Sequence, residues 1–227
     1  VNVVKTKGIY MIYKYIKRML DVILSVIGLI LLSPIMLITA IAIKLESKGP
    51  VIFQQDRLGL NGQVFKIYKF RSMCIGAEKD GVYETKGDMR VTKVGRIIRK
   101  TSIDELPQFV NIIKGDMSII GPRPTLTYHP WPIEKYTDEQ RKRFNVRPGV
   151  TGWAQINGRK DVPWDKRIEY DVWYVDNLSF GLDFKIFFKT VIKVLTMQDN
   201  INVGETAANN TALSTTKSET AATTIKD

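Results

Sequence analysis

At 227 residues the chain has room for one domain, alone or with appendages, and a hydrophobic content of 44% is enough to form a core. The formal net charge of +11 indicates an anionic partner, such as a membrane surface, a nucleic acid or a phosphorylated substrate. A single cysteine excludes an internal disulfide, and a single histidine argues against histidine metal sites and Ser-His-Asp triads, so that acid–base or nucleophilic chemistry falls to carboxylates, lysines or hydroxyls.

The uncharged apolar run at 22–43 is long enough for a helix to cross a hydrocarbon core of about 30 Å. Ser33 and Pro34 lie at its middle, where proline removes an amide hydrogen bond and bends or breaks a helix. Both flanks are basic, and Lys and Arg prefer the cytoplasmic side of a membrane. We therefore predict a re-entrant helix within residues 1–48 that enters and leaves on one side. The Ser33 hydroxyl or neighbouring protein would satisfy the freed carbonyl. A single span and a buried soluble helix are the alternatives.

Two β-rich runs follow at 51–60 and 63–72, joined by an Asn-Gly pair that is a strong hairpin signal. Alternation along the second run places Lys69 and Arg71 on one face and Lys66 on the other. Lys69 and Arg71 form either a solvated strand face or part of a phosphate site.

The next segment, 76–90, is predicted to be loop because it is rich in glycine and charge. Residues 93–100 then carry cations at helical spacings on an exposed face, Arg99 among them.

An acidic pair comes next. Ser102 and Glu105 match a capping box, which gives Glu105 a structural role. Pro107 fits better if the helix begins at Asp104, because proline is tolerated in a first turn. Asp104 and Glu105 then lie at a helix N-terminus, which favours their ionised forms, and Gly115 ends that helix.

The segment 121–124, Gly-Pro-Arg-Pro, cannot form regular structure, and its two prolines present Arg123 rigidly. An arginine fork held in this way suits a diphosphate. Residues 134–146 are predicted to form a short charged helix. Residues 146–159 are predicted to be a polar glycine-rich loop in which a backbone can approach a ligand, with Gln155 among its polar side chains.

Residues 164–178 predict a helix with clustered aromatics. Residues 182–196 predict a basic amphipathic helix rich in phenylalanine, which either lies in a membrane surface or faces a core. Residues 205–227 have the composition of a disordered tail, which leaves 49–204 as the domain that follows the membrane helix. We predict an α/β fold, mainly helical with a small β-hairpin, in a monotopic membrane protein with interfacial amphipathic helices.

An ordered set of motifs closely resembles the bacterial sugar transferases, also called monotopic phosphoglycosyl transferases or polyprenyl-phosphate sugar-1-phosphate transferases, in their minimal catalytic form. The resemblance covers about residues 11–196 and implies that 49–204 is the cytosolic catalytic domain. The motifs are KRMLDV, the apolar run broken at Ser33-Pro34, KFRSM, SIDELPQ, KGDMSIIGPRP, RPGVTGWAQINGR and DVWYVDN.

The resemblance implies transfer of sugar-1-phosphate from a UDP-sugar to polyprenyl phosphate, such as undecaprenyl phosphate, with release of UMP. It places this reaction at the cytoplasmic face of the inner membrane, as the first membrane step of an exopolysaccharide, capsule, O-antigen or glycoconjugate. Asp104 would be the nucleophile of a covalent phospho-sugar intermediate, and Glu105 would help to hold Mg²⁺ or assist the acceptor. Arg99 and Arg123 would grip phosphates, and no nucleic acid is implied. A homo-oligomer is left open.

Two alternatives lead to different tests. A membrane-attached basic binding module would use its charges for affinity alone, so Asp104→Asn would be harmless. A ternary-complex transferase would bind both substrates at once and form no covalent intermediate.

Overall fold

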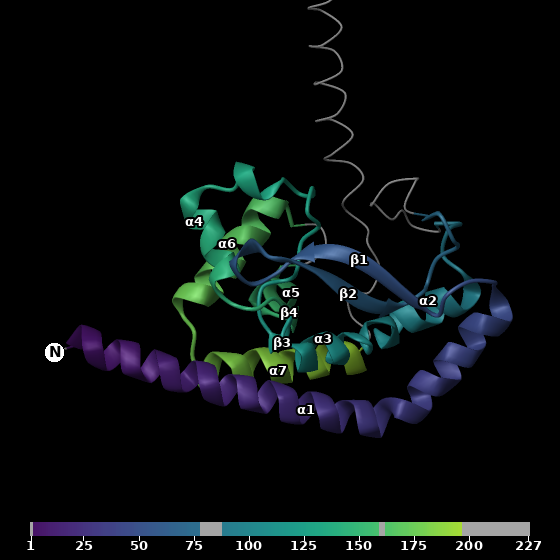
Figure 1. Cartoon of the computed structure of the whole chain (residues 1–227), viewed down its shortest axis with the longest axis horizontal. Coiled ribbons are helices and arrows are strands. Elements are labelled where there is room, and N and C mark those ends of the chain that lie inside the picture. Colours follow the sequence, from purple (N-terminus) through teal and green to yellow (C-terminus); the bar gives the residue numbers. More distant parts are fainter. Residues whose placement is uncertain (1, 78–87, 159–161, 197–227) are drawn as a thin grey trace, which may run out of the picture.

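The computed structural model describes residues 2–77, 88–158 and 162–196. Within these ranges the chain is mostly helical, with two small sheets, as Figure 1 shows. The helices are α1 (Asn2–Glu46), α2 (Lys93–Lys100), α3 (Gln108–Lys114), α4 (Asp138–Arg141), α5 (Trp153–Asn157), α6 (Trp164–Asp176) and α7 (Phe180–Leu195). The strands are β1 (Ile52–Leu58), β2 (Val64–Phe70), β3 (Ser118–Ile120) and β4 (Gly149–Thr151). Most of the predicted loop at 76–90 and the whole predicted tail lie outside the described residues.

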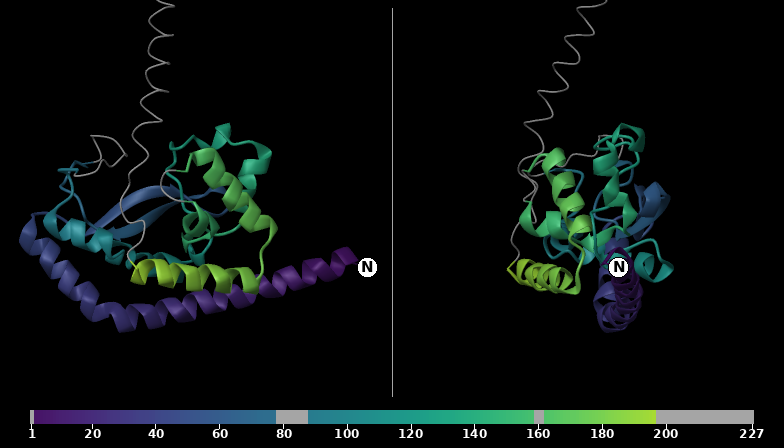
Figure 2. Two further views of the ribbon diagram at one scale, coloured as in Figure 1. Left: turned by 180° about the vertical axis from the view of Figure 1, so that it is seen from behind. Right: turned by 90° about the vertical axis from the view of Figure 1, so that its left-hand side faces the viewer.

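Helix α1 is one long, bent helix that runs beneath the rest of the molecule (Figures 1 and 2). It contains Pro34, which cannot bond to the carbonyl of Ile30, and the Ser33 hydroxyl donates to that carbonyl at 2.8 Å. The prediction that Ser33 supplies the freed carbonyl with a partner is confirmed. The chain stays helical through the proline, so the helix bends without breaking.

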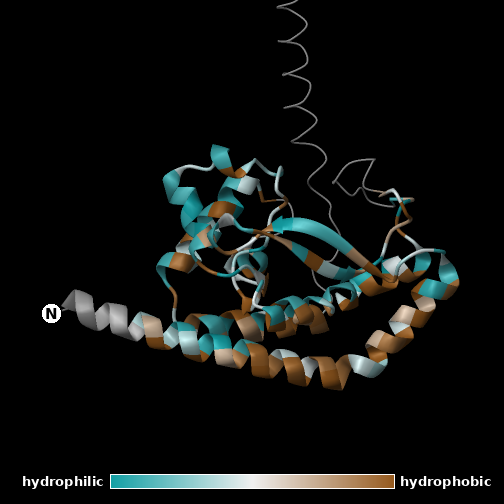
Figure 3. Ribbon diagram, viewed as in Figure 1, coloured by the Kyte–Doolittle hydropathy of each residue, from teal (hydrophilic) through white to brown (hydrophobic). Residues whose placement is uncertain are grey.

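The apolar surface of α1 is largely uncovered. The stretch Tyr10–Glu46 is long and apolar enough to cross a membrane, and only 11% of its apolar window is buried inside the protein. Figure 3 shows that hydrophobic residues dominate the middle and later part of α1. The alternative of a buried soluble helix is therefore wrong.

Both ends of α1 contact the same globular body. Towards the N-terminal end, Asp183 of α7 accepts a hydrogen bond from the Tyr13 hydroxyl at 2.7 Å and forms an ion pair with Lys17 at 3.0 Å. At the C-terminal end, the Glu46 carboxylate accepts from the backbone N–H groups of Lys93 and Val94, the first residues of α2. These two sets of contacts, here called the two fastenings of α1, lie on either side of the bend at Pro34.

The predicted hairpin is confirmed. Strands β1 and β2 pair antiparallel with Leu58 opposite Val64, and a 3-10 turn at Leu60–Gly62 joins them. Lys66 forms an exposed ion pair with Asp56 at 3.0 Å, on the face opposite Lys69, as alternation predicts.

A second, parallel pair of strands was not predicted. Strand β3 pairs with β4, both only three residues long, and they bring the Gly-Pro-Arg-Pro segment beside the glycine-rich one. The contact is tight, because a Cβ built on Gly149 would lie 2.1 Å from the backbone nitrogen of Gly121. The predicted polar loop at 146–159 thus contains strand β4 and helix α5.

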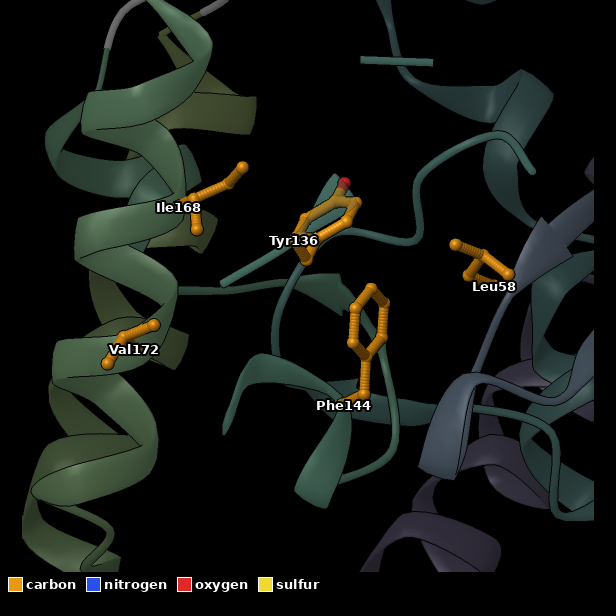
Figure 4. Packing of buried hydrophobic residues seen from close by; sticks show 5 residues of the cluster. All are labelled: Leu58, Tyr136, Phe144, Ile168 and Val172. Carbon is orange, nitrogen blue, oxygen red and sulfur yellow. The ribbon is translucent and has the colours of Figure 1, made fainter. Parts of the chain in front are cut away.

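Several buried clusters hold these elements together. One of them, shown in Figure 4, joins β1 to α6 through Leu58, Tyr136, Phe144, Ile168 and Val172. The predicted helix at 134–146 is present only as short pieces: a 3-10 turn at Ile133–Lys135, α4, and a second 3-10 turn at Lys142–Asn145. The helices predicted at 164–178 and 182–196 are confirmed as α6 and α7.

Candidate active site

The acidic pair lies in a 3-10 turn, Ile103–Glu105, immediately before α3. Ser102 has left-handed backbone angles (φ 57°, ψ 16°) and its side chain makes no capping bond, so the capping-box interpretation is wrong. Helical geometry begins within a residue of the predicted start, but the α-helix proper begins at Gln108 with Pro107 as its N-cap. Gly115 ends the helix at φ 100°, as predicted.

Glu105 is held by two cations. Its Oε1 accepts from the ammonium of Lys69 at 2.7 Å and from the guanidinium of Arg123 at 3.3 Å. Burial alone would raise the pKa of Glu105, but Lys69 and then Arg123 outweigh it and lower that pKa to about 2. Glu105 therefore stays ionised and fixes Lys69 and Arg123 beside it.

Asp104 has a different environment, although it is the neighbouring residue. It is 9% exposed, and its carboxylate forms no hydrogen bond or ion pair in the part of the chain that the structure describes. Burial raises the pKa of Asp104 to about 6, against the opposing effect of Lys69. The prediction that a helix N-terminus favours the ionised form is wrong for Asp104, because burial has the larger effect. An unpaired carboxylate of this kind is available to a ligand.

The acidic pair opens into a cavity of about 1140 Å³. All seven residues that the sequence singled out for catalysis or substrate binding line it: Lys69, Arg71, Arg99, Asp104, Glu105, Arg123 and Gln155. Leu32 and Ile35 of α1 line the same cavity, as do Thr190 and Val194 of α7. The cavity thus joins a charged centre to apolar side chains of α1 and α7, two helices that carry many exposed hydrophobic residues.

The predicted arginines differ in how they are used. Arg99 reaches the cavity from α2 and donates to the Ser72 hydroxyl at 3.4 Å. Arg71 is buried, and its guanidinium binds the backbone carbonyls of Ser47 and Lys48, just after α1 ends. Arg71 therefore attaches the end of α1 to the cavity wall.

Gln155 lies on α5, and both polar atoms of its side-chain amide are buried without a hydrogen-bond partner in the described chain. Such groups are uncommon in folded proteins because an unpaired buried amide is costly. The Gln155 amide thus lines the cavity without forming, in the described chain, any hydrogen bond that would stabilise the fold.

Comparison with known proteins identifies the family of this chain. A family model described as "Bacterial sugar transferase" matches residues 12–197. The chain belongs to this family. It is 48% identical over 180 residues to the "Uncharacterized sugar transferase EpsL" of Bacillus subtilis. The matched region covers 79% of this chain and 87% of that protein.

Two further relatives carry names that state a reaction. This sugar transferase is 49% identical over 189 residues to the "UDP-N-acetylgalactosamine-undecaprenyl-phosphate N-acetylgalactosaminephosphotransferase" of Aeromonas hydrophila, covering 82% of this chain and 45% of that protein. It is 47% identical over 192 residues to the "UDP-glucose:undecaprenyl-phosphate glucose-1-phosphate transferase" of Klebsiella pneumoniae, covering 82% of this chain and 41% of that one. The chain spans less than half the length of these two relatives.

Four cationic side chains of the sugar transferase's cavity are not among the site residues predicted from the sequence: Arg57, Arg90, Arg167 and Lys193. Arg57 on β1 lines the cavity and donates to the carbonyl of Pro124 at 3.3 Å. Burial, and then repulsion by Arg123, lower the pKa of Arg57 to about 10. The hairpin register could have found it, because Arg57 and Lys69 have the same parity across the pairing Phe53 to Lys69 and so share one face.

Proposed function

We propose that this sugar transferase moves sugar-1-phosphate from a UDP-sugar to polyprenyl phosphate, with release of UMP. One observation carries the proposal: two neighbouring carboxylates in the same cavity have different environments. Asp104 is buried and forms no hydrogen bond or ion pair among the described residues, whereas Glu105 holds Lys69 and Arg123. The cavity extends to α1. The names of the relatives support the reaction class.

In the proposed first step, an Asp104 carboxylate oxygen attacks the phosphorus that bears the sugar. A bond forms between that oxygen and phosphorus, and the bond from phosphorus to the bridging oxygen breaks, so that UMP leaves with the electron pair. In the second step a phosphate oxygen of the lipid attacks the same phosphorus and releases the Asp104 carboxylate. Carboxylate nucleophiles form such intermediates because they divide one difficult transfer into two easier ones.

The cations give the reaction its electrostatic support. Charge spreads over the phosphoryl oxygens in the transition state, and fixed guanidinium and ammonium groups stabilise it. Lys69 and Arg123 are held at the required place by Glu105, and Arg99 lines the same space. The low pKa of Glu105 makes it a poor proton acceptor, and the acceptor phosphate is already ionised, so we assign Glu105 to positioning.

The acidic pair also fits a divalent cation. Mg²⁺ takes one or two carboxylates and completes its shell with water and phosphate oxygens. Within the described ranges the Asp104 oxygens form no hydrogen bond or ion pair, and both contacts of Glu105 use Oε1. Asp104 and Glu105 would hold the ion, which would neutralise charge on the diphosphate.

We further propose that α1 is re-entrant and that the enzyme lies on the cytoplasmic face of the membrane. Both ends of α1 are fastened to one body, so a straight crossing would have to detach one of them. Helix α7 adds exposed apolar side chains, Phe184, Phe188 and Leu195, which suit an interfacial helix. The lipid acceptor would then reach the cavity without leaving the membrane.

The test is UMP release from a panel of UDP-sugars with polyprenyl phosphate and Mg²⁺, for the wild-type protein, Asp104→Asn and the control Glu139→Gln. Glu139 is an exposed carboxylate on α4 that pairs with Lys142. We expect Asp104→Asn to abolish UMP release while the control retains it. Full activity of Asp104→Asn would remove the proposed chemistry, and a wild-type protein that releases no UMP from any UDP-sugar would support the binding module.

Covalent and ternary routes separate in a labelling experiment. A donor radiolabelled in its sugar, incubated without lipid acceptor, should label the wild-type protein and leave Asp104→Asn unlabelled. An unlabelled wild-type protein that still makes lipid product would rule out the covalent route. The panel also identifies the donor sugar.

A further inference from the structure

The segment 121–125, which carries Arg123, is held by its backbone carbonyls. Four consecutive carbonyl oxygens each accept a hydrogen bond from another element. The pairs are Pro122 with the N–H of Gly149 (2.9 Å), Arg123 with the guanidinium of Arg143 (2.8 Å), Pro124 with the guanidinium of Arg57 (3.3 Å), and Thr125 with the N–H of Leu58 (2.9 Å). The carbonyl of Arg123 itself is thus bound by a charged side chain.

Arg143 is the centre of a buried network. Its Nε and Nη2 donate to Oδ2 of Asp171 at 3.2 and 2.7 Å, and its Nη1 donates to the hydroxyl of Thr125 at 3.2 Å. Arg143 is 2% exposed and Asp171 is 3% exposed. Desolvating two charges is costly, so a buried ion pair is weak evidence for a purely stabilising role.

The side chain of Arg123, in contrast, is 48% exposed and contacts Glu105 at 3.3 Å. A long, exposed side chain loses rotamer entropy when it binds a ligand, and a fixed backbone origin reduces the range that it must give up. A small displacement of the backbone would move its guanidinium away from Glu105 and from the cavity.

We propose that Arg143 and Asp171 are positioning residues that act through Arg123 to set the grip on the donor diphosphate. The inference rests on the proposed function only in taking the ligand to be a UDP-sugar. Asp171 orients and neutralises the Arg143 fork, the fork fixes the carbonyl of Arg123, and the side chain of Arg123 then meets the diphosphate together with Lys69 and Glu105.

The test measures UDP and uridine binding by calorimetry in the presence of Mg²⁺. The first variant is Arg143→Lys, which keeps a positive charge near Asp171 but lacks the fork that reaches both Asp171 and the Arg123 carbonyl. We expect about tenfold weaker UDP binding, the size of one lost charge-assisted hydrogen bond, and unchanged uridine binding. Val172→Ala is the matched control, because Val172 adjoins Asp171 but packs in the cluster of Figure 4.

A double-variant cycle shows whether the effect passes through Arg123. Arg123→Ala should weaken UDP binding by itself, and adding Arg143→Lys should then change it little, because the group being positioned is gone. If Arg143→Lys fails to fold, Asp171→Asn takes its place in the same cycle, since it leaves the Arg143 fork present but without its counter-charge.

Three results would overturn the positioning role: unchanged UDP affinity in Arg143→Lys, an equal loss of UDP affinity in Val172→Ala at matched melting temperature, or a full additional loss in the Arg123→Ala background. The proposed reaction is judged separately. If the wild-type protein releases UMP from no UDP-sugar and the cycle behaves as expected, the positioning stands and the reaction fails.

Discussion

Replacing Asn111 with alanine should destabilise the protein strongly, because this buried side chain joins α3 to the outer edge of β2. Its Oδ1 accepts from the backbone N–H of Tyr68 at 2.9 Å, and its Nδ2 donates to the carbonyl of Lys66 at 2.7 Å. Both strand groups face away from β1, and the Asn111 amide gives them the partners that a third strand would give. Asn111 is 0% exposed, so water cannot take its place readily.

The magnitude follows from the two strand groups that lose their partner. The Asp116 carboxylate also loses the hydrogen bond that Nδ2 of Asn111 donates to it at 3.1 Å. Each unsatisfied buried donor or acceptor costs about 1–3 kcal/mol, so Asn111→Ala should lower the free energy of unfolding by about 2–6 kcal/mol. Thermal or urea unfolding in detergent measures it. Asn157→Ala is the control. That side chain is exposed, and among the described residues its hydrogen bond is to the carbonyl of Trp153, so a change within about 0.5 kcal/mol is expected.

A loss below about 1 kcal/mol in Asn111→Ala would refute this account of how α3 and β2 are joined. The consequence extends to the site, since Lys69 is carried by β2 while Glu105 directly precedes α3. The ion pair between them should weaken with the junction, and UMP release by any folded Asn111→Ala protein should fall in parallel.

Three further changes have expected outcomes. Asp183→Asn leaves Lys17 without its counter-charge and should lower the free energy of unfolding by about 2–3 kcal/mol, measured by thermal unfolding in detergent; a melting temperature equal to that of the wild type would contradict it. Gly95→Ala places a Cβ 2.0 Å from the Ser72 carbonyl oxygen and should displace α2, which a fall in both melting temperature and UMP release would register. Ser33→Ala removes the donor at the bend of α1 and should cost about 1–2 kcal/mol, visible as faster proteolysis in detergent, whereas Ser33→Thr should keep the bond.

The elements set by local sequence were predictable. The Asn-Gly pair indicated the hairpin, and the proline together with Ser33 indicated both the bend in α1 and the partner of the freed carbonyl. The helices α6 and α7 followed from their periodicity. In each case the signal and the structure lie within a few residues of each other.

Contacts between distant segments were not predictable in the same way. Strands β3 and β4 have three residues each, which is too short for alternation to identify them, and they pair across an intervening segment of more than 25 residues. The pKa of Asp104 depends on burial by cavity walls that come from several elements, so its helix position alone gave the wrong direction. The catalytic roles of Asp104 and Glu105 came from the family motifs, whereas the prolines beside Arg123 had already indicated a phosphate-binding arginine. Their shared cavity is a tertiary result.

The two fastenings of α1 fix the number of residues between them. An α-helix advances 1.5 Å and turns about 100° with each residue, so one amino acid inserted between Lys17 and Glu46 would rotate one fastening to the wrong side of the helix. The apolar run should therefore tolerate substitution of one hydrophobic residue by another far better than insertion or deletion of a residue. In this protein the membrane anchor therefore also sets a distance, because its contacts with α7 and α2 fix the length of helix between them.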